Sequence, residues 1–341
     1  MAAAKEVKGL DCGAGALEGI RLVLRTRFGE MYDLREATLG REDAKGVHDM
    51  RVASRRLRSA LRDFRGFYDR KGLPKRRLKE VARALGEVRD QDVAIAALEK
   101  RLSKASGAVA EGIEHLLDER RALRSRARAG LGPVIAEVPL KELHLKFSSW
   151  LEHAGGGARD KPGVRRSLGS ALGASFWQAG VEVIESRLTE LLKLGDSIYH
   201  PFEFESLHRM RIAAKRLRYA LELFAPCWGG RLKSAAREVS ELQTALGDLR
   251  DCDTWIADLS PRLDRRHDKS EDAGASIADP RVRPAAIWLL SHFTKERGEH
   301  FSSALECWQK WENSGFFEQV SEALRGIQAI QPEAPAAQDR Q

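Results

Sequence analysis

Two segments of the chain place histidine and arginine side chains at the spacing of a helix face. Residues 47–64 read VHDMRVASRRLRSALRDF and residues 207–224 read LHRMRIAAKRLRYALELF, and ten of the eighteen aligned positions are identical. Because residues three or four positions apart share one face of a helix, each segment predicts a helix with one cationic row. The first row is His48, Arg51, Arg55, Arg58 and Arg62, and the second is His208, Arg211, Lys215 and Arg218.

The chemistry that these rows favour is the binding of phosphate groups. Like charges one turn apart repel each other, and a helix face that merely meets solvent usually mixes the two signs. The first row contains no acid, and it borders the apolar positions that must face a core. Arginine offers a planar fork to two phosphate oxygens, and histidine can become charged beside an anion. A solvated face is the alternative that the sequence leaves open.

The helix that follows the first row is expected to enlarge the cationic surface. Lys75, Lys79 and Arg83 are one turn apart on it. Aromatic residues make up 7% of the chain and none interrupts these rows, so platforms for stacking bases are not evident. The pattern therefore favours a ligand that is phosphate and little else.

A second motif also occurs twice, as LGEVRDQD at 85–92 and LGDLRDCD at 246–253. Its glycine permits close approach of a neighbouring helix. Its acidic positions, Asp90, Asp92, Asp251 and Asp253, are expected to hold arginines in place, with Arg56 and Arg216 as the suggested partners. Binding of a divalent metal through a phosphate is the weaker alternative. A second rank of candidate polyanion-binding residues comprises Arg56, Arg216, Arg89, Arg250, Arg120 and Arg297.

The elements that must position these side chains are helices, because apolar residues recur at helical spacing and strict alternation is almost missing. We predict helices at 14–39, 44–70, 74–101, 106–131, 140–154, 166–194, 203–225, 230–258, 281–311 and 314–327. Since both motifs repeat at an offset of about 160 residues, the fold class is all-α with two four-helix bundles related by internal duplication. The bundles are expected at 10–154 and 164–325, joined by a flexible HAGGGARDKPG stretch at 153–163 and followed by a disordered tail at 327–341.

The charge of the chain is uneven. The net charge is +8 and the isoelectric point is about 9.4. Residues 47–89 hold 14 basic and 5 acidic side chains, which equals the whole excess of the first half, whereas the second half is slightly acidic. This concentration favours a polyanionic partner on one surface.

No secretory signal or membrane-spanning run is evident, and the four cysteines are scattered without a C-x-x-C pair. We therefore expect reduced, inert thiols, a cytoplasmic location and no membrane partner.

The combination of H-x-x-R-x-x-x-[RK]-R-L-R at 48–58 and 208–218 with the LGxxRDxD segments resembles the CHAD family, over roughly residues 10–325. The resemblance implies two bundles related by pseudo-twofold symmetry around a basic central cleft. It also implies binding of inorganic polyphosphate and an association with polyphosphate granules. Glu222 stands opposite Arg62, and only Arg297 matches the Arg120–Arg121 pair, so this chain departs from the pattern in its second half. These departures predict a weaker contribution from that half.

Two other functions compete with non-catalytic polyphosphate binding. Nonspecific binding of nucleic acid would use the same cations and would show a similar dependence on salt. A phosphohydrolase would need metal ions held by carboxylates, or a positioned base, and the chain carries neither a G-x-x-x-x-G-K-[ST] nor an H-E-x-x-H motif. We therefore expect no enzyme activity, no cofactor and no protein-bound metal. Chain-length preference and oligomeric state are not indicated by the sequence.

Overall fold

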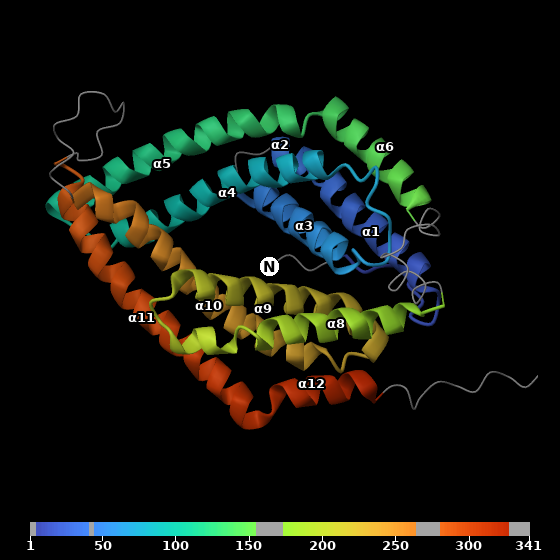
Figure 1. Ribbon diagram of the computed structural model, residues 1–341. Helices are drawn as coiled ribbons and strands as arrows, with labels where there is room; N and C mark the ends of the chain where they lie inside the picture. Colours follow the sequence, from blue (N-terminus) through green and yellow to red (C-terminus); the bar gives the residue numbers. More distant parts are fainter. Residues whose placement is uncertain (1–4, 41–43, 155–172, 264–279, 327–341) are drawn as a thin grey trace, which may run out of the picture. The chain divides into compact units, whose positions relative to one another are not determined.

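The computed structural model describes residues 5–40, 44–154, 173–263 and 280–326 (Figure 1). Within these ranges every regular element is a helix, apart from an isolated antiparallel bridge between Gly15 and Ser175. The prediction of an all-α fold is therefore confirmed. The described helices include none with both the length and the apolar character needed to cross a membrane.

The helices divide between two compact units. The first unit comprises residues 1–176 and 248–299, and the second comprises residues 177–247 and 300–341. The predicted division into bundles at 10–154 and 164–325 has different bounds and stays a prediction, as do the internal duplication, the pseudo-twofold symmetry and the central cleft. The predicted connection at 153–163 falls largely outside the described residues, and so does the tail at 327–341.

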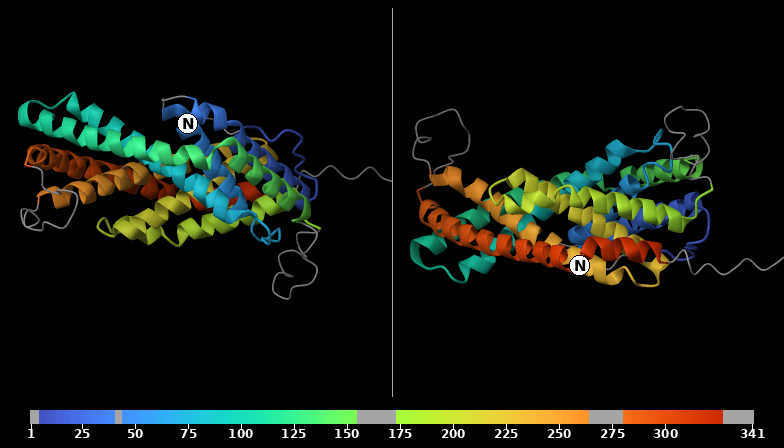
Figure 2. Two further views of the ribbon diagram at one scale, coloured as in Figure 1. Left: turned by 90° about the horizontal axis from the view of Figure 1, so that it is seen from above. Right: turned by 60° about the horizontal axis from the view of Figure 1, so that its bottom comes forward.

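In the first unit, the cationic helix α3 packs against both α1 and α4, and α5 runs beside α4 (Figure 1). The two long helices α4 and α5 form a hairpin that is clear in the left view of Figure 2. The helices are α1 (Ala16–Asp33), α2 (Arg35–Leu39), α3 (Ala44–Asp63), α4 (Lys75–Leu102), α5 (Gly107–Val134) and α6 (Glu137–His153). The helix predicted at 14–39 is divided at Leu34 into α1 and α2. The other sequence-based bounds in this unit are close to the observed ones except at the end of α3.

Helix α3 ends seven residues earlier than predicted because the chain turns inward to bury aromatic side chains. Phe64, Phe67 and Tyr68 are all buried. The hydroxyl of Tyr68 donates to the carbonyl of Leu61, and the ring of Tyr68 meets that of Trp150 edge-on at 5.1 Å. Burying three aromatic rings outweighs the continuation of a helix through Gly66.

The later helices serve both units. They are α8 (Phe176–Leu192), α9 (Phe204–Phe224), α10 (Lys233–Leu259), α11 (Arg283–Ser314) and α12 (Phe316–Arg325), with 3₁₀ turns η2 (Gly195–Tyr199), η3 (Ala225–Trp228) and η4 (Ser260–Leu263). The last part of α4 and the first part of α5 form an apolar cluster with the second part of α10 and the first part of α11. The cluster includes Leu98, Leu116, Trp255 and Phe293. This shared core explains why residues 248–299 belong to the first unit.

In the second unit, small residues let α8 and η2 approach aromatic rings. A side chain on Gly180 would lie 2.7 Å from the ring of Phe224, and one on Gly195 would lie 2.6 Å from the indole of Trp308. Phe224 and Trp308 are buried. At these two places in the core of this unit, a large aromatic ring packs directly against a glycine.

The expectation of four inert thiols is only partly met. Cys252 and Cys307 are free, and burial raises the pKa of their thiols to about 12 and about 11. Cys12 and Cys227 are disulfide-bonded, so the expectation was wrong for these two residues. Because disulfides are rare in reducing compartments, the cysteines no longer support the predicted cytoplasmic location.

Candidate functional site

The cationic row of α3 is fixed against α4 at one well-defined contact. Arg51 Nη1 donates to the carbonyl oxygen of Gly86 at 3.0 Å and to Asp90 Oδ1 at 2.9 Å. A Cβ atom at position 86 would lie 3.2 Å from Arg51 Nη1, which is tighter than an ordinary van der Waals contact. The glycine and the first aspartate of the LGEVRDQD motif therefore together receive the guanidinium of Arg51.

This contact sets the register of the two antiparallel helices. Seven residues, or about 10 Å at 1.5 Å per residue, separate Arg51 from Arg58 on α3 and Gly86 from Lys79 on α4. By this count we expect Arg58 to come level with Lys79, and Arg62 with Lys75. In the other direction His48 comes level with Arg89, and the charge of Arg89 does act on His48.

The cations of α4 share the stripe that borders α3. Lys75, Lys79, Arg83, Gly86 and Asp90 follow one another at spacings of four, four, three and four residues, which is one helix face. Since Gly86 and Asp90 contact α3, the preceding cations lie along the same boundary. We call the combined set the α3–α4 basic surface: His48, Arg51, Arg55, Arg58, Arg62, Lys75, Lys79, Arg83 and Arg89.

The members of the α3–α4 basic surface differ in exposure. Arg58, Lys75, Lys79 and Arg83 are exposed, and the other members are half-buried. An exposed ion pair of 3.5 Å joins Arg83 to Glu87 on the same helix. The pKa of His48 is lowered by burial and by the positive charges of Arg89 and Arg55, which disfavour a further cation. The lowered pKa of His48 indicates that neighbouring cations act on this part of the surface.

In the corresponding row on α9, the last cation is paired with a carboxylate. Arg218 is buried, and its guanidinium donates to Glu222 Oε1 at 2.5 Å and to Gln243 Oε1 at 2.8 Å. The same group lies 4.7 Å from the centre of the Tyr219 ring. His208, Arg211 and Lys215 are half-buried. Glu222, which the sequence already marked as a departure, thus forms an ion pair with the last cation of the row.

The repeated Gly has the same neighbour in this unit. A Cβ atom at Gly247 would lie 3.5 Å from Arg211 Nε, as the one at Gly86 would approach Arg51. On α10, Ala236, Ser240 and Thr244 occupy the positions that correspond to Lys75, Lys79 and Arg83 at the offset of 161. The second unit therefore has no counterpart to the exposed cations of α4 at these positions.

The prediction that the motif aspartates hold arginines is confirmed for Asp90, Asp92 and Asp253, whose arginine partners are not the suggested ones. Asp92 Oδ1 accepts from Arg124 Nε at 2.6 Å, and Asp253 Oδ1 accepts from Arg297 Nε at 2.7 Å. Both aspartates are buried. Arg124 has no motif of its own in the sequence, so only the tertiary contact reveals its role.

The suggested partner Arg216 instead pairs with Glu190 of α8, which also accepts from Arg187 at 2.8 Å. Arg56 is half-buried on α3.

Two of the second-rank arginines take part in the core of the first unit. Arg120 pairs with Asp258, and its guanidinium lies 5.3 Å from the centre of the Trp255 ring. Arg297 is buried with Asp253. Arg250 is half-buried on α10. The geometry thus gives Arg120 and Arg297 structural contacts, and a contact with ligand stays a prediction for all members of this group.

Comparison with known proteins identifies relatives by family and by fold. A family model described as the CHAD domain matches residues 23–260. The crystal structure of the CHAD domain from the plant Ricinus communis is similar, with 20% sequence identity, a TM-score of 0.66, and coverage of 89% of this chain and 95% of that chain. PptA from Streptomyces chartreusis is similar at 17% identity and a TM-score of 0.57, with coverage of 87% of this chain and 100% of that chain. No curated protein matches the chain.

Proposed function

The chain belongs to the CHAD family, and on that premise we propose that it binds inorganic polyphosphate on the α3–α4 basic surface without cleaving it. The observation that carries this proposal is the register between α3 and α4. The contacts of Arg51 with Gly86 and Asp90 set this register, from which we expect cations of the two helices to follow one boundary. Same-face residues on a helix are about 5–6 Å apart, so a chain of phosphates could be contacted repeatedly along the surface.

The carboxylates that border this surface support binding over catalysis. Asp90 accepts from Arg51, and Glu87 pairs with Arg83. Phosphoryl transfer depends on groups that position a nucleophile and stabilise a charge that develops in the transition state. A carboxylate whose oxygen already accepts from an arginine is less available to activate a nucleophile.

The row on α9 is proposed as a weaker contributor, through His208, Arg211 and Lys215. Arg218 contributes least, since Glu222 and Gln243 already occupy its guanidinium. Cytoplasmic location and association with polyphosphate granules belong to the same proposal and follow from the family alone.

The test uses exposed cations, whose replacement leaves the core intact. Arg51 is unsuitable because a glutamate there would face Asp90 and leave the Gly86 carbonyl without its donor. The variant Arg58→Glu/Lys79→Glu instead reverses two exposed charges at one level of the surface. Its matched control is Lys104→Glu/Arg126→Glu, which makes the same change of charge at exposed positions away from this surface.

Binding of long-chain polyphosphate is measured by calorimetry over a series of salt concentrations. We expect the Arg58→Glu/Lys79→Glu variant to lose affinity at least about tenfold, since charge-assisted contacts are worth on the order of tenfold each. The slope of the logarithm of the binding constant against the logarithm of the salt concentration should become shallower by roughly 1.4, because each of the two lost phosphate contacts removes about 0.7. The control should change affinity by less than about threefold. Equal losses in the two variants would remove the α3–α4 basic surface from the proposal.

A competition experiment separates polyphosphate from nucleic acid. Duplex DNA and single-stranded RNA are added to the complex at equal phosphate concentration. The proposal expects polyphosphate to remain bound, because the surface offers phosphate contacts and no stacking platform. If either nucleic acid displaces polyphosphate efficiently, the protein is better described as a nonspecific nucleic-acid-binding protein.

A further inference from the structure

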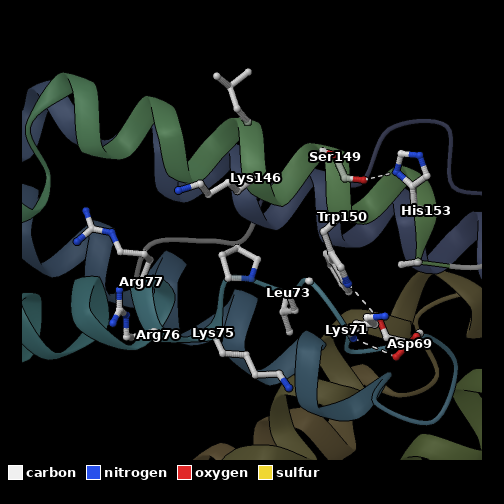
Figure 3. A pocket seen from close by; sticks show the side chains of 14 residues that line it. Asp69, Lys71, Leu73, Lys75, Arg76, Arg77, Lys146, Ser149, Trp150 and His153 are labelled. Carbon is white, nitrogen blue, oxygen red and sulfur yellow. Dashed lines mark hydrogen bonds between the residues drawn. The ribbon is translucent and has the colours of Figure 1, made fainter.

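A second cationic site lies in the first unit, where the loop after α3, the start of α4 and the end of α6 meet (Figure 3). The pocket has a volume of about 890 Å³. Its charged lining consists of five cations and one carboxylate: Lys71, Lys75, Arg76, Arg77, Lys146 and Asp69. Lys75, Arg76 and Arg77 come from the first turn of α4, whereas Lys71 comes from the loop before α4 and Lys146 from α6.

The walls of the pocket are fixed by backbone contacts. Trp150 Nε1 donates to the carbonyl oxygen of Asp69 at 3.1 Å, and the backbone N–H of Asp69 donates to the carbonyl oxygen of Ala154 at 3.1 Å. Figure 3 shows the indole of Trp150 pointing from α6 toward the loop that carries Asp69 and Lys71. The pocket is therefore formed before any ligand arrives.

The positive charge of the pocket is poorly compensated. The carboxylate of Asp69 accepts from the backbone N–H of Lys71 at 3.0 Å. Arg77 pairs with Glu80 at 2.7 Å, and Lys146 pairs with Glu142 at 3.9 Å. Among the described residues, no carboxylate pairs with the side chains of Lys71, Lys75 or Arg76. The N-terminus of α4, which no side chain caps, adds the positive end of its helix dipole.

Besides Ser149 and His153, the remaining lining is apolar, which sets this pocket apart from the α3–α4 basic surface. Leu73 and Pro74 form one side, and Leu145 of α6 is 61% exposed at the rim. The edge of the buried Trp150 completes this part. Inorganic phosphate chains have no apolar portion to cover such a lining. The ligand that matches both kinds of wall has a charged end and an apolar body.

We propose that this pocket binds an organic phosphate of nucleotide size, with its phosphoryl groups among the lysines and arginines and its apolar body against Leu73, Pro74 and Leu145. The volume lies in the range of pockets for small organic ligands. This site goes beyond polyphosphate binding, because it requires the organic part of the molecule and, apart from Lys75, uses residues outside the α3–α4 basic surface.

The experiment compares ATP with inorganic tripolyphosphate by calorimetry on the full chain. Both probes carry three phosphates, and only ATP has an organic body. We expect ATP to bind at least about tenfold more tightly in the unsubstituted protein, because burial of an apolar body adds free energy to the same phosphate contacts. Tripolyphosphate binding as tightly as ATP would overturn the proposal.

Two variants test the two walls separately. Lys71→Glu/Lys146→Glu reverses exposed charges and should weaken ATP binding at least about tenfold, whereas Lys104→Glu/Arg126→Glu should change it less than about threefold. Leu145→Ser should weaken the binding of ATP and leave the binding of tripolyphosphate unchanged. Because Leu145 is exposed, this substitution should not destabilise the fold. If both pocket variants bind ATP as tightly as the unsubstituted protein, the site is refuted.

The Arg58→Glu/Lys79→Glu variant distinguishes this inference from the proposed function. We expect it to lose polyphosphate and to retain ATP. If it loses both ligands, the nucleotide uses the α3–α4 basic surface and the pocket is refuted while polyphosphate binding stands. If ATP binding depends on the pocket but polyphosphate does not bind at all, the pocket stands and the proposed function fails.

Discussion

Asp90 and Asp92 are two residues apart in one motif, yet their replacement should have very different consequences for stability. The side chain of Asp92 is 3% exposed and accepts from Arg124, whereas the side chain of Asp90 is 66% exposed and pairs with Arg51. An exposed ion pair contributes about 0–1 kcal/mol. Removing one partner of a buried pair costs about 3–5 kcal/mol, because it strands the other charge.

From these exposures we expect Asp92→Ala to lower the free energy of unfolding by about 2–4 kcal/mol. This cost is set slightly below the value of about 3–5 kcal/mol for a fully buried pair, because Arg124 is itself 29% exposed and can reach water. Asp90→Ala should cost less than about 1 kcal/mol. Asp253→Ala should resemble Asp92→Ala, since Asp253 is 5% exposed and its partner Arg297 is 11% exposed.

Urea unfolding followed by circular dichroism measures these differences, with each transition fitted separately because the chain forms two compact units. The double variant Asp92→Ala/Arg124→Met should recover part of the loss, since it removes the stranded guanidinium along with its carboxylate. The reasoning would be refuted if Asp92→Ala cost no more than Asp90→Ala, or if the double variant were as unstable as the sum of the single ones.

Two further predictions concern a proton and a close approach. His48 should titrate below 6.5 in the free protein, so its contribution to stability is complete above that pH and falls as the pH is lowered toward the folded pKa. Bound polyphosphate should raise this pKa, so binding should take up protons and strengthen as the pH falls, and an NMR titration in which the pKa did not rise on binding would contradict the proposed site. Gly112→Ala should destabilise the first unit by about 1–2 kcal/mol, because the added Cβ would lie 2.7 Å from Ala285 Cβ and 2.8 Å from the carbonyl oxygen of Arg281. Gly130→Ala on the same helix meets nothing within 4 Å and should be neutral or stabilising by up to about 1 kcal/mol, and equal melting temperatures for the two variants would show that the close approach is not tight.

Helical periodicity predicted where most of the helices lie, because an amphipathic pattern depends on neighbours three and four residues away. The bounds of α4, α5 and α9 differ from prediction by a few residues at most. The end of α3 was missed because Phe64, Phe67 and Tyr68 continue a helical pattern yet find their apolar contacts by leaving the helix.

The sequence by itself determined the all-α class, the cationic row on α3 and the repeated motifs, because each is a matter of residue type and local spacing. Only the tertiary structure decided which partners the charges have. Asp92 pairs with Arg124, thirty-two residues away on another helix, and no local spacing encodes that contact. The basic pocket beside Trp150 likewise depends on a loop and α6 being brought to the start of α4. Charge pairing and cavity shape are set by distances between elements, which a linear pattern does not contain.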